Sequence, residues 1–297
     1  MDRRSLLKLL LAAGGAAPWA GACQPRAERG SMSESTSGSS PGVMPAIFLA
    51  HGSPFLLDDA MWLEELRVWA DAMPRPSAVL MLSAHWLDEP LAIGATRTVP
   101  LDYDFYNFPE RFYQVTYPAP GAPALARRVE ELLGGSRAVR SVPDRGLDHG
   151  AFVPLVGMYP KADVPVLQIS FPTMDPEALL ALGRSLAPLR REGVLIVGSG
   201  FLTHNLRAAN FRTATTAPSW AIDFDAWCAD VLARQDADEL VQYRARAPGV
   251  QMALPTHEHF VPVLVAMGAA LEMPGKVAFP ITGFVHGSFT RRSVQFG

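Results

Sequence analysis

A short apolar run that ends in a histidine constrains this chain more than any other feature. Residues 46–51 read Ala-Ile-Phe-Leu-Ala-His, and a Gly-Ser-Pro turn follows. The pattern recurs at residues 78–85 and, with the histidine a few residues later, at residues 194–204. Short apolar runs bounded by turn residues predict buried strands. If the three strands are parallel, their histidines meet at the edge of the sheet where open α/β folds bind ligands.

Helical patterns alternate with predicted strands along the rest of the chain. Apolar residues three or four positions apart predict helices over residues 58–72, 122–133, 176–189, 219–232, 237–246 and 260–271. Further strands are expected over residues 91–96, 138–142, 164–170 and 276–281. This alternation predicts an α/β fold, with a single domain around a mostly parallel central sheet and helices on both faces.

Residues 1–23 have the composition of an export signal. Arg3 and Arg4 precede an apolar run, and small residues then lead to Cys23. This order is typical of a twin-arginine signal. We therefore expect the protein to be exported, and to be periplasmic or held at a membrane by a lipid anchor on Cys23. Without export it would be cytoplasmic.

Residues 24–43 separate this leader from the predicted folded domain, residues 44–297. They are rich in Ser, Gly and Pro and have no apolar period, which predicts a flexible linker. The domain contains one cysteine, Cys228, and therefore no disulfide framework. The chain of 297 residues has a formal net charge of −3 and no long basic run, so we expect no nucleic-acid partner.

All seven histidines of the chain fall within the predicted folded domain. His51, His85 and His204 follow equivalent strands and are candidate metal ligands, because imidazole binds zinc, iron and copper well. His257 and His259 stand two positions apart before a predicted helix, and we expect only one of them to point at the site. This pair does not form the His-Glu-x-x-His motif of zinc metalloproteases.

His149 lies in a polar loop directly after Asp148, with no predicted strand to direct it at the other histidines. A histidine close to a metal but not bound to it is suited to acid–base catalysis, because its ordinary pKa is close to neutral. Asp144 and Asp148 are candidates to orient its ring. We expect His286 and His257 to have supporting or structural roles.

Seven aromatic residues fall within residues 101–120, among prolines and without a clear period. The segment is either a loop fixed to the core by its rings or one wall of a pocket for a flat, apolar or aromatic molecule. As the wall of a substrate pocket it would present Tyr103, Phe105 and Phe108, and we expect Ser53 to contact the substrate as well.

Taken together, these motifs resemble those of the class III extradiol ring-cleavage dioxygenases of the LigB type, and most closely the 4,5-DOPA dioxygenase branch. The resemblance covers about residues 45–297. The matching motifs are His51-Gly-Ser-Pro54, Ser83-Ala-His-Trp86, Asp104-Phe105 through Phe108-Pro109, Tyr117-Pro-Ala-Pro-Gly121, Asp148-His-Gly150, His204-Asn-Leu-Arg207, Glu258-His259 and Ser293-Val-Gln.

The resemblance implies an enzyme that inserts dioxygen into a DOPA-like catechol at a mononuclear non-haem metal, with Fe(II) expected for activity and Zn(II) as an alternative occupant. It implies that His51, His85 and His259 bind the metal, that His204 lies beside them or completes the site, and that His149 is the acid–base catalyst. A monomer or small homo-oligomer is expected. The histidine at position 257 and the export leader depart from the family, and the first leaves open which histidine of the pair binds.

Two other functions are compatible with the same histidines. A zinc-dependent hydrolase would use them to activate water, although the chain carries no recognisable hydrolase motif. A non-catalytic metal-binding protein is the second alternative, and it would have no need of the aromatic segment 101–120 or of His149.

Overall fold

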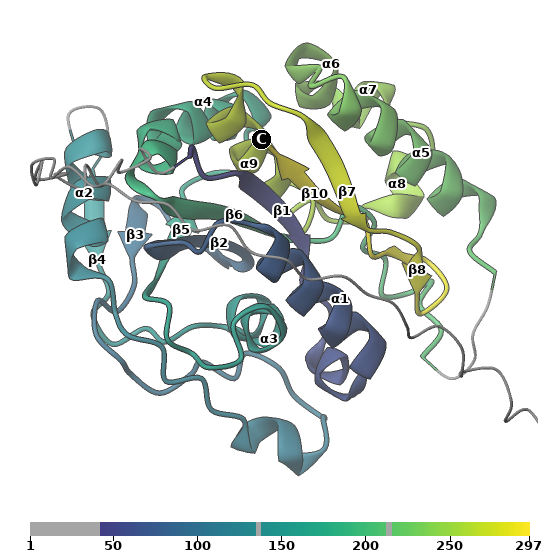
Figure 1. Ribbon diagram of the computed structural model, residues 1–297. Helices are drawn as coiled ribbons and strands as arrows, with labels where there is room; N and C mark the ends of the chain where they lie inside the picture. Colours follow the sequence, from purple (N-terminus) through teal and green to yellow (C-terminus); the bar gives the residue numbers. More distant parts are fainter. Residues whose placement is uncertain (1–41, 135–137, 212–215) are drawn as a thin grey trace, which may run out of the picture. The chain divides into compact units, whose positions relative to one another are not determined.

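The computed structural model describes residues 42–134, 138–211 and 216–297, which belong to one compact unit (Figure 1). The predicted leader, and the predicted linker up to residue 41, lie outside the described residues. None of the helices that are described is both long enough and apolar enough to cross a membrane.

A mixed eight-stranded sheet forms the centre of this unit. Its strands are β1 (Ala46–Ala50), β2 (Ala78–Leu87), β3 (Leu91–Ile93), β4 (Val139–Ser141), β5 (Val166–Phe171), β6 (Val194–Gly200), β7 (Val277–Ile281) and β10 (Ser293–Phe296). The spatial order is β4-β3-β5-β2-β6-β1-β10-β7. The four central strands β5, β2, β6 and β1 are parallel, whereas β10 runs antiparallel to β1 and β3 runs antiparallel to β5. The prediction of a mostly parallel sheet is confirmed.

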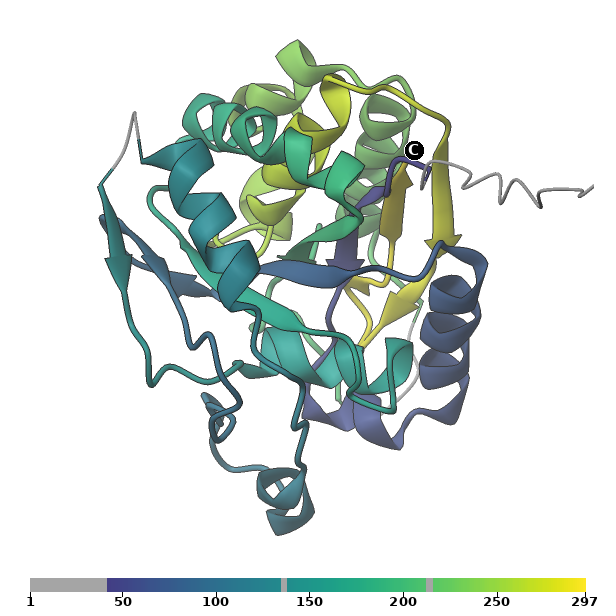
Figure 2. The same ribbon diagram turned by 60° about the vertical axis from the view of Figure 1, so that its left-hand side comes forward.

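Helices cover both faces of this sheet (Figures 1 and 2). They are α1 (Ala60–Ala72), α2 (Pro123–Leu133), α3 (His149–Met158), α4 (Pro176–Leu186), α5 (Ser219–Ala233), α6 (Ala237–Val241), α7 (Tyr243–Arg246), α8 (Val250–Ala253) and α9 (Pro262–Leu271). Helices α1 and α3 pack together on one face, and α4 and α9 pack together on the other. Short 3₁₀ turns add η1 (Pro54–Asp58), η2 (Glu110–Gln114) and η3 (Ala187–Glu192), and β8 (Phe284–Val285) pairs with β9 (Phe289–Thr290) in a separate hairpin.

Successive side chains of the central strands point to opposite faces of the sheet, and this divides the core into two apolar clusters. In β1, Ala46 and Phe48 face the α4 and α9 side, while Ile47 and Leu49 face the α1 and α3 side. All of these side chains are fully buried. A parallel sheet that is covered on both faces has this nearly continuous apolar composition.

The largest difference from the sequence prediction is helix α3. Its ten residues are apolar on every side except for His149, and nine of them are buried. Because the helix has no polar face, it shows none of the amphipathic spacing that reveals a surface helix. A smaller difference lies at residues 237–246, where the single helix that we predict is two short helices, α6 and α7.

Candidate active site

Three neighbouring parallel strands bring histidines to one edge of the sheet. Strand β6 lies between β2 and β1, and Ser199 of β6 is level with Leu49 of β1 and Ser83 of β2. His51 follows β1 directly, and His85 lies near the end of β2, two residues before its last residue. Their ring centroids are 5.0 Å apart. His51 and His85 therefore lie next to each other at this edge of the sheet, as expected.

Helix α3 adds a third imidazole to this edge. His149 is its first residue, and the His149 ring centroid lies 4.0 Å from that of His85 and 5.6 Å from that of His51. Gly150 permits this approach, because a Cβ there would lie 2.3 Å from Ser83 Oγ and 2.9 Å from His85 Cδ2. Ring nitrogens of His51, His85 and His149 all lie within 4.8 Å of one another, which is compact enough to hold one metal ion.

The loop before α9 supplies His259. Its ring centroid is 5.3 Å from that of His51 and 4.9 Å from that of His85. The His259 carbonyl accepts a hydrogen bond of 2.8 Å from the backbone of Phe201, and a Cβ at Gly200 would lie 2.0 Å from that carbonyl oxygen. Glycine at position 200 thus allows the loop to reach the end of β6. We refer to His51, His85, His149 and His259 as the histidine cluster.

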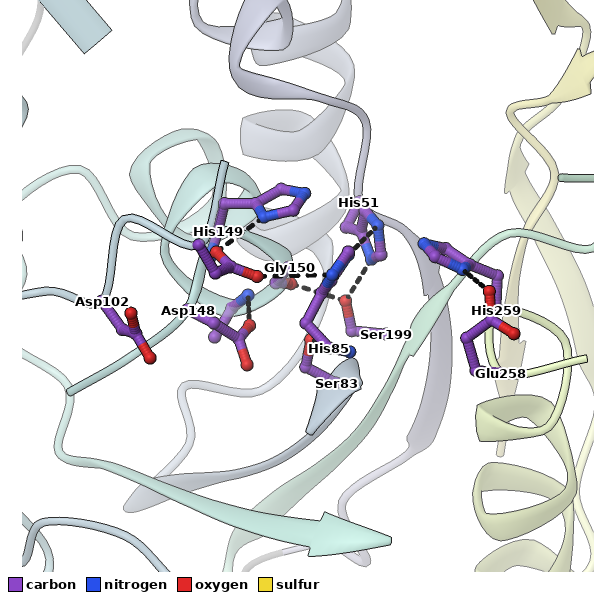
Figure 3. Close-up of polar contacts among 12 residues, drawn as sticks. His51, Ser83, His85, Asp102, Asp148, His149, Gly150, Ser199, Glu258 and His259 are labelled. Carbon is purple, nitrogen blue, oxygen red and sulfur yellow. Dashed lines mark hydrogen bonds and ion pairs between the residues drawn. The ribbon is translucent and has the colours of Figure 1, made fainter. Parts of the chain in front are cut away.

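Hydrogen bonding fixes the tautomer of His51. Ser199 Oγ lies 2.5 Å from the Gly150 carbonyl oxygen, which can only accept, so the hydroxyl donates its proton there. The same hydroxyl lies 2.9 Å from His51 Nδ1 and must accept from it (Figure 3). His51 therefore carries its proton on Nδ1, and its Nε2 lone pair is free for a metal.

Asp104 performs for two histidines the role that we expected of Asp148 and Asp144. Its carboxylate lies 2.8 Å from His149 Nδ1 and 3.3 Å from His85 Nδ1, and it also accepts from the His149 backbone N–H at 2.9 Å. Burial raises the pKa of Asp104, but the hydrogen bond and the charge interactions with these histidines outweigh it and lower the pKa to about 2. The carboxylate is therefore ionised and orients both rings.

The predicted role of Asp148 and Asp144 is wrong. Asp148 is the N-cap of α3 and accepts a hydrogen bond from the backbone N–H of Ala151. Its other oxygen accepts from Gln168 and pairs with Arg145, while Asp104 is the partner of His149 Nδ1. Asp144 lies on the surface and pairs with Arg97.

His51 and His85 are arranged as two ligands of one cation would be. Their Nε2 atoms are 3.3 Å apart. Since both rings place Nδ1 against an oxygen partner, two lone pairs face each other, and an ion between them would remove the repulsion. Burial and the neighbouring histidines lower the pKa of His51 well below its ordinary value and that of His85 to about 4. Both rings are thus in the neutral form that binds metals.

His204 contacts the cluster in a different way. Its ring stacks on His259, with centroids 3.5 Å apart and an angle of 12° between the planes. His259 Nδ1 donates to the Glu258 carboxylate at 3.0 Å (Figure 3). Ring nitrogens of His204 and His259 and a carboxylate oxygen of Glu258 all lie within 4.8 Å of one another, so this group could also hold a metal ion. Burial lowers the pKa of His204 to about 4. His257 lies beside Tyr243, 5.5 Å between ring centroids, so the two members of the 257/259 pair point in different directions, as expected.

A cavity of about 540 Å³ opens above the histidine cluster. Three of the four residues that we expected to contact substrate, Ser53, Phe105 and Phe108, line it. Tyr103 does not, because its hydroxyl donates to the Val115 carbonyl and its ring packs on Phe152 and Phe105. The aromatic segment is thus both a wall of the cavity and a loop fixed to the core.

Further lining residues were not singled out from the sequence. They include Asp59, Trp62, Phe201 and Phe289; His286, expected in a supporting role, lines the cavity as well. Four large apolar residues at the mouth are between 38% and 80% exposed, and we call them the apolar rim: Phe55, Tyr106, Leu206 and Phe211. They come from η1, from the loop after β3 and from the loop after β6, so no local pattern in the sequence marks them as neighbours.

Comparison with known proteins identifies the family. A family model described as the catalytic LigB subunit of aromatic ring-opening dioxygenase matches residues 45–296. The chain belongs to the LigB family of class III extradiol dioxygenases. It is 41% identical over 242 residues to a 4,5-DOPA dioxygenase extradiol of Beta vulgaris, which covers 79% of this chain and 90% of that protein. The corresponding enzyme of Escherichia coli K12 is 37% identical over 86% of this chain and 95% of its own length.

A solved structure shares the fold of this chain. The crystal structure of an uncharacterized protein from Escherichia coli K12 superposes with a TM-score of 0.73 and 34% sequence identity, over 86% of this chain and all of that one. The protein is therefore an aromatic ring-opening dioxygenase similar to the 4,5-DOPA extradiol enzymes, and its buried histidines could bind a metal. Membership of the LigB family favours this activity over the zinc hydrolase and the non-catalytic metal-binding protein.

Proposed function

We propose that the protein cleaves the ring of a catechol with dioxygen, next to one of the two hydroxyls, at a single Fe(II) ion held by His51, His85 and His259. The observation that carries the proposal is the pair of Nε2 atoms 3.3 Å apart beneath an apolar cavity. Imidazole nitrogens bind first-row divalent ions at about 2.1 Å, so two of them on one ion lie roughly 3.3 Å apart when their angle is about 105°.

Ring separations favour His259 over His149 as the third ligand. At that bond length a ring centroid lies about 3.2 Å from the ion, so two ligand rings should be roughly 5 Å apart. The separations among His51, His85 and His259 are 5.0, 5.3 and 4.9 Å. His149 is only 4.0 Å from His85, which is too close for two rings that both point at one ion.

The stacking geometry favours a supporting role for His204 over a ligand set that contains both His204 and His259. Imidazole binds a metal in the plane of its ring, so two nearly parallel rings 3.5 Å apart are poorly oriented to share an ion, although ring nitrogens of both lie within 4.8 Å of each other. We therefore assign His204 to the support of His259, where the stacked ring fixes the orientation in which His259 Nε2 faces the other two histidines.

His149 is the acid–base group of this proposal. Its Nδ1 is held by Asp104, which leaves Nε2 available to take a proton from a catechol hydroxyl and to return it to an oxygen of the product. Because Asp104 is ionised, it stabilises the imidazolium that forms. The ion, when bound, supplies the redox chemistry that couples an electron-rich catecholate to dioxygen. Phe105 and Phe108 are placed to pack on the substrate ring.

Oxygen uptake is the test of this function. The protein is loaded anaerobically with Fe(II), its metal content is measured, and catechol, 4-methylcatechol and L-DOPA are added. We expect stoichiometric oxygen uptake and a new visible absorption from a ring-opened product. No uptake from a sample with full iron occupancy would contradict the proposal, and the zinc-loaded protein with hydrolysable esters would then be examined.

We also propose that residues 1–23 direct export, on the twin-arginine pattern and with Cys23 as the candidate lipid anchor. Replacement of Arg3 and Arg4 by lysine should retain the protein in the cytoplasmic fraction, and Cys23→Ala should release it from the membrane fraction if a lipid is attached. Size-exclusion chromatography of the exported protein would test the expected monomer or small homo-oligomer.

A further inference from the structure

The charge of the cavity lining argues against an anionic substrate. Among the described residues that line it, three are carboxylates and none is lysine or arginine. Asp104 and Glu258 already hold histidines, and one oxygen of Asp59 caps α1 by accepting from the Trp62 backbone. A carboxylate on the substituent that enters the outer part of this cavity loses water and meets no lysine or arginine among the described lining residues, which is costly.

Two arginines outside the lining, Arg291 and Arg111, are already paired with carboxylates. Arg291 stacks over the Trp62 ring at 4.7 Å and forms an ion pair with Glu65. Arg111 pairs with Asp58 at 2.6 Å. A substrate carboxylate would have to compete with a protein carboxylate for either guanidinium.

The size and composition of the mouth point to an apolar substituent. Cavities of about 300–1,000 Å³ suit drug-sized ligands, and a simple catechol leaves much of a 540 Å³ space unfilled. The apolar rim surrounds that space with large side chains, one of which, Tyr106, is 80% exposed. Phe55 extends the row of rings inward, 5.0 Å from Phe108 between centroids. Exposed apolar side chains gathered at a cavity mark a binding surface.

We propose that this cavity selects catechols whose ring substituent is bulky and apolar and carries no carboxylate. The inference rests on the proposed function and extends it to the class of substrate. The two hydroxyls of the catechol face the histidine cluster, and the substituent fills the outer part of the cavity against the apolar rim. The amino-acid side chain of DOPA, with its carboxylate, is the poorer fit.

A matched series of catechols tests the selection. The Fe(II)-loaded full chain is assayed for kcat/KM by oxygen uptake with 4-phenylcatechol, 4-methylcatechol, dihydroxyphenylpropionate and L-DOPA. We expect 4-phenylcatechol to exceed both carboxylate-bearing compounds by at least about tenfold, with 4-methylcatechol in between. A higher kcat/KM for dihydroxyphenylpropionate or L-DOPA than for 4-phenylcatechol would overturn the inference.

Equilibrium binding of the same compounds separates the inference from the proposed function. If no catechol is cleaved by fully loaded protein, the proposed function fails, while the order of the dissociation constants still supports or overturns the selection.

Arg212, next to Phe211 in sequence, lies outside the described residues. A preference for the propionate that Arg212→Ala abolishes would overturn the inference and identify the cation responsible.

A pair of leucine variants locates the selection in the rim. Leu206 is 63% exposed at the mouth, and Leu87, which does not line the cavity, is 50% exposed at the end of β2. Leu206→Ala should lower kcat/KM for 4-phenylcatechol roughly three- to tenfold and leave that for 4-methylcatechol within about twofold. Leu87→Ala should change neither. An equal loss for both substrates in Leu206→Ala would contradict a role of the rim in selection.

Discussion

The histidine cluster and the apolar rim belong to one cavity but are built in opposite ways. Every imidazole of the cluster has an oxygen partner at Nδ1: Ser199 for His51, Asp104 for His85 and His149, and Glu258 for His259. The rim residues are 38% to 80% exposed and come from the 3₁₀ turn η1 and from two loops. The comparison shows that hydrogen bonds fix the orientation of the reacting imidazoles before substrate binds. The side chains of the rim, which would contact the substituent, are held by fewer neighbours and can change rotamer.

Removal of a central ligand should have the largest effect. His51 directly follows β1 and is only 1% exposed, and its Nε2 faces that of His85. His51→Ala should abolish stoichiometric Fe(II) binding and lower turnover more than about 100-fold, since even loss of an outer partner of a metal ligand costs about 10–100-fold. Metal analysis after desalting provides the measurement. Retention of one tightly bound ion per chain would show that the centre lies elsewhere.

A comparison of His149→Ala with His259→Ala distinguishes the catalyst from the ligand. We expect His149→Ala to keep its iron and lose about 10²–10⁴-fold in kcat, because only proton transfer is removed. His259→Ala should lose iron and activity together. Iron content and oxygen uptake are measured on the same samples. The reverse pattern would make His149 the third ligand.

Asp104→Asn should have an intermediate effect. The amide keeps the size of the side chain, but it cannot stabilise a charged His149 ring or accept from two imidazoles as a carboxylate does. We expect kcat to fall about 10–100-fold with iron binding weakened to a similar extent. Steady-state kinetics and iron titration provide the measurement, and Asp144→Asn, on the surface, is the control. Unchanged kinetics in Asp104→Asn would remove this carboxylate from the mechanism.

Acid should destabilise the metal-free protein through the histidines first. Burial lowers the pKa of His85 and of His204 from 6.5 to about 4. The unfolded chain therefore binds more protons below pH 6.5, so the free energy of unfolding falls as the pH drops from 6.5 toward 4, by on the order of 3 kcal/mol for His85. Asp104 and Glu258, with pKa values of about 2, extend the loss between pH 4.5 and 2.

Urea titrations across this pH range check the expectation. His85→Gln should flatten the dependence between pH 6.5 and 4, while Leu206→Ala, in the rim, should keep the wild-type profile. A free energy of unfolding that does not change between pH 6.5 and 4 would contradict the buried, neutral state of these histidines.

The smallest effect is expected for truncation of the rim. Tyr106 is 80% exposed, and a surface side chain of this kind contributes within about 0.5 kcal/mol to stability. Tyr106→Ala should therefore unfold at the same urea concentration as the wild type and cleave 4-methylcatechol at nearly the same rate. A stability loss above about 1 kcal/mol would mean that the rim is part of the core rather than a substrate-facing surface.

Much of the fold could be predicted because its signals are local. Apolar runs such as residues 46–50 and 194–200 are read directly as strands, and their ends identify the functional edge of a parallel sheet. Helix α3 could not be predicted, because a helix that is buried on all sides has no polar period. His149 was recognised from its motif, but its direction depended on this unseen helix.

The sequence by itself determined the strand–helix order, the edge to which His51 and His85 are delivered, and the family of the chain. Only the tertiary structure decided the partners of these histidines. Asp104 meets His149 across 45 positions of sequence, and Ser199 meets His51 across 148. The physical reason is that the spacing of apolar residues shows only which face of its own helix or strand a residue occupies. A hydrogen bond between distant residues depends on how helices and strands pack against one another, and no local pattern specifies that packing.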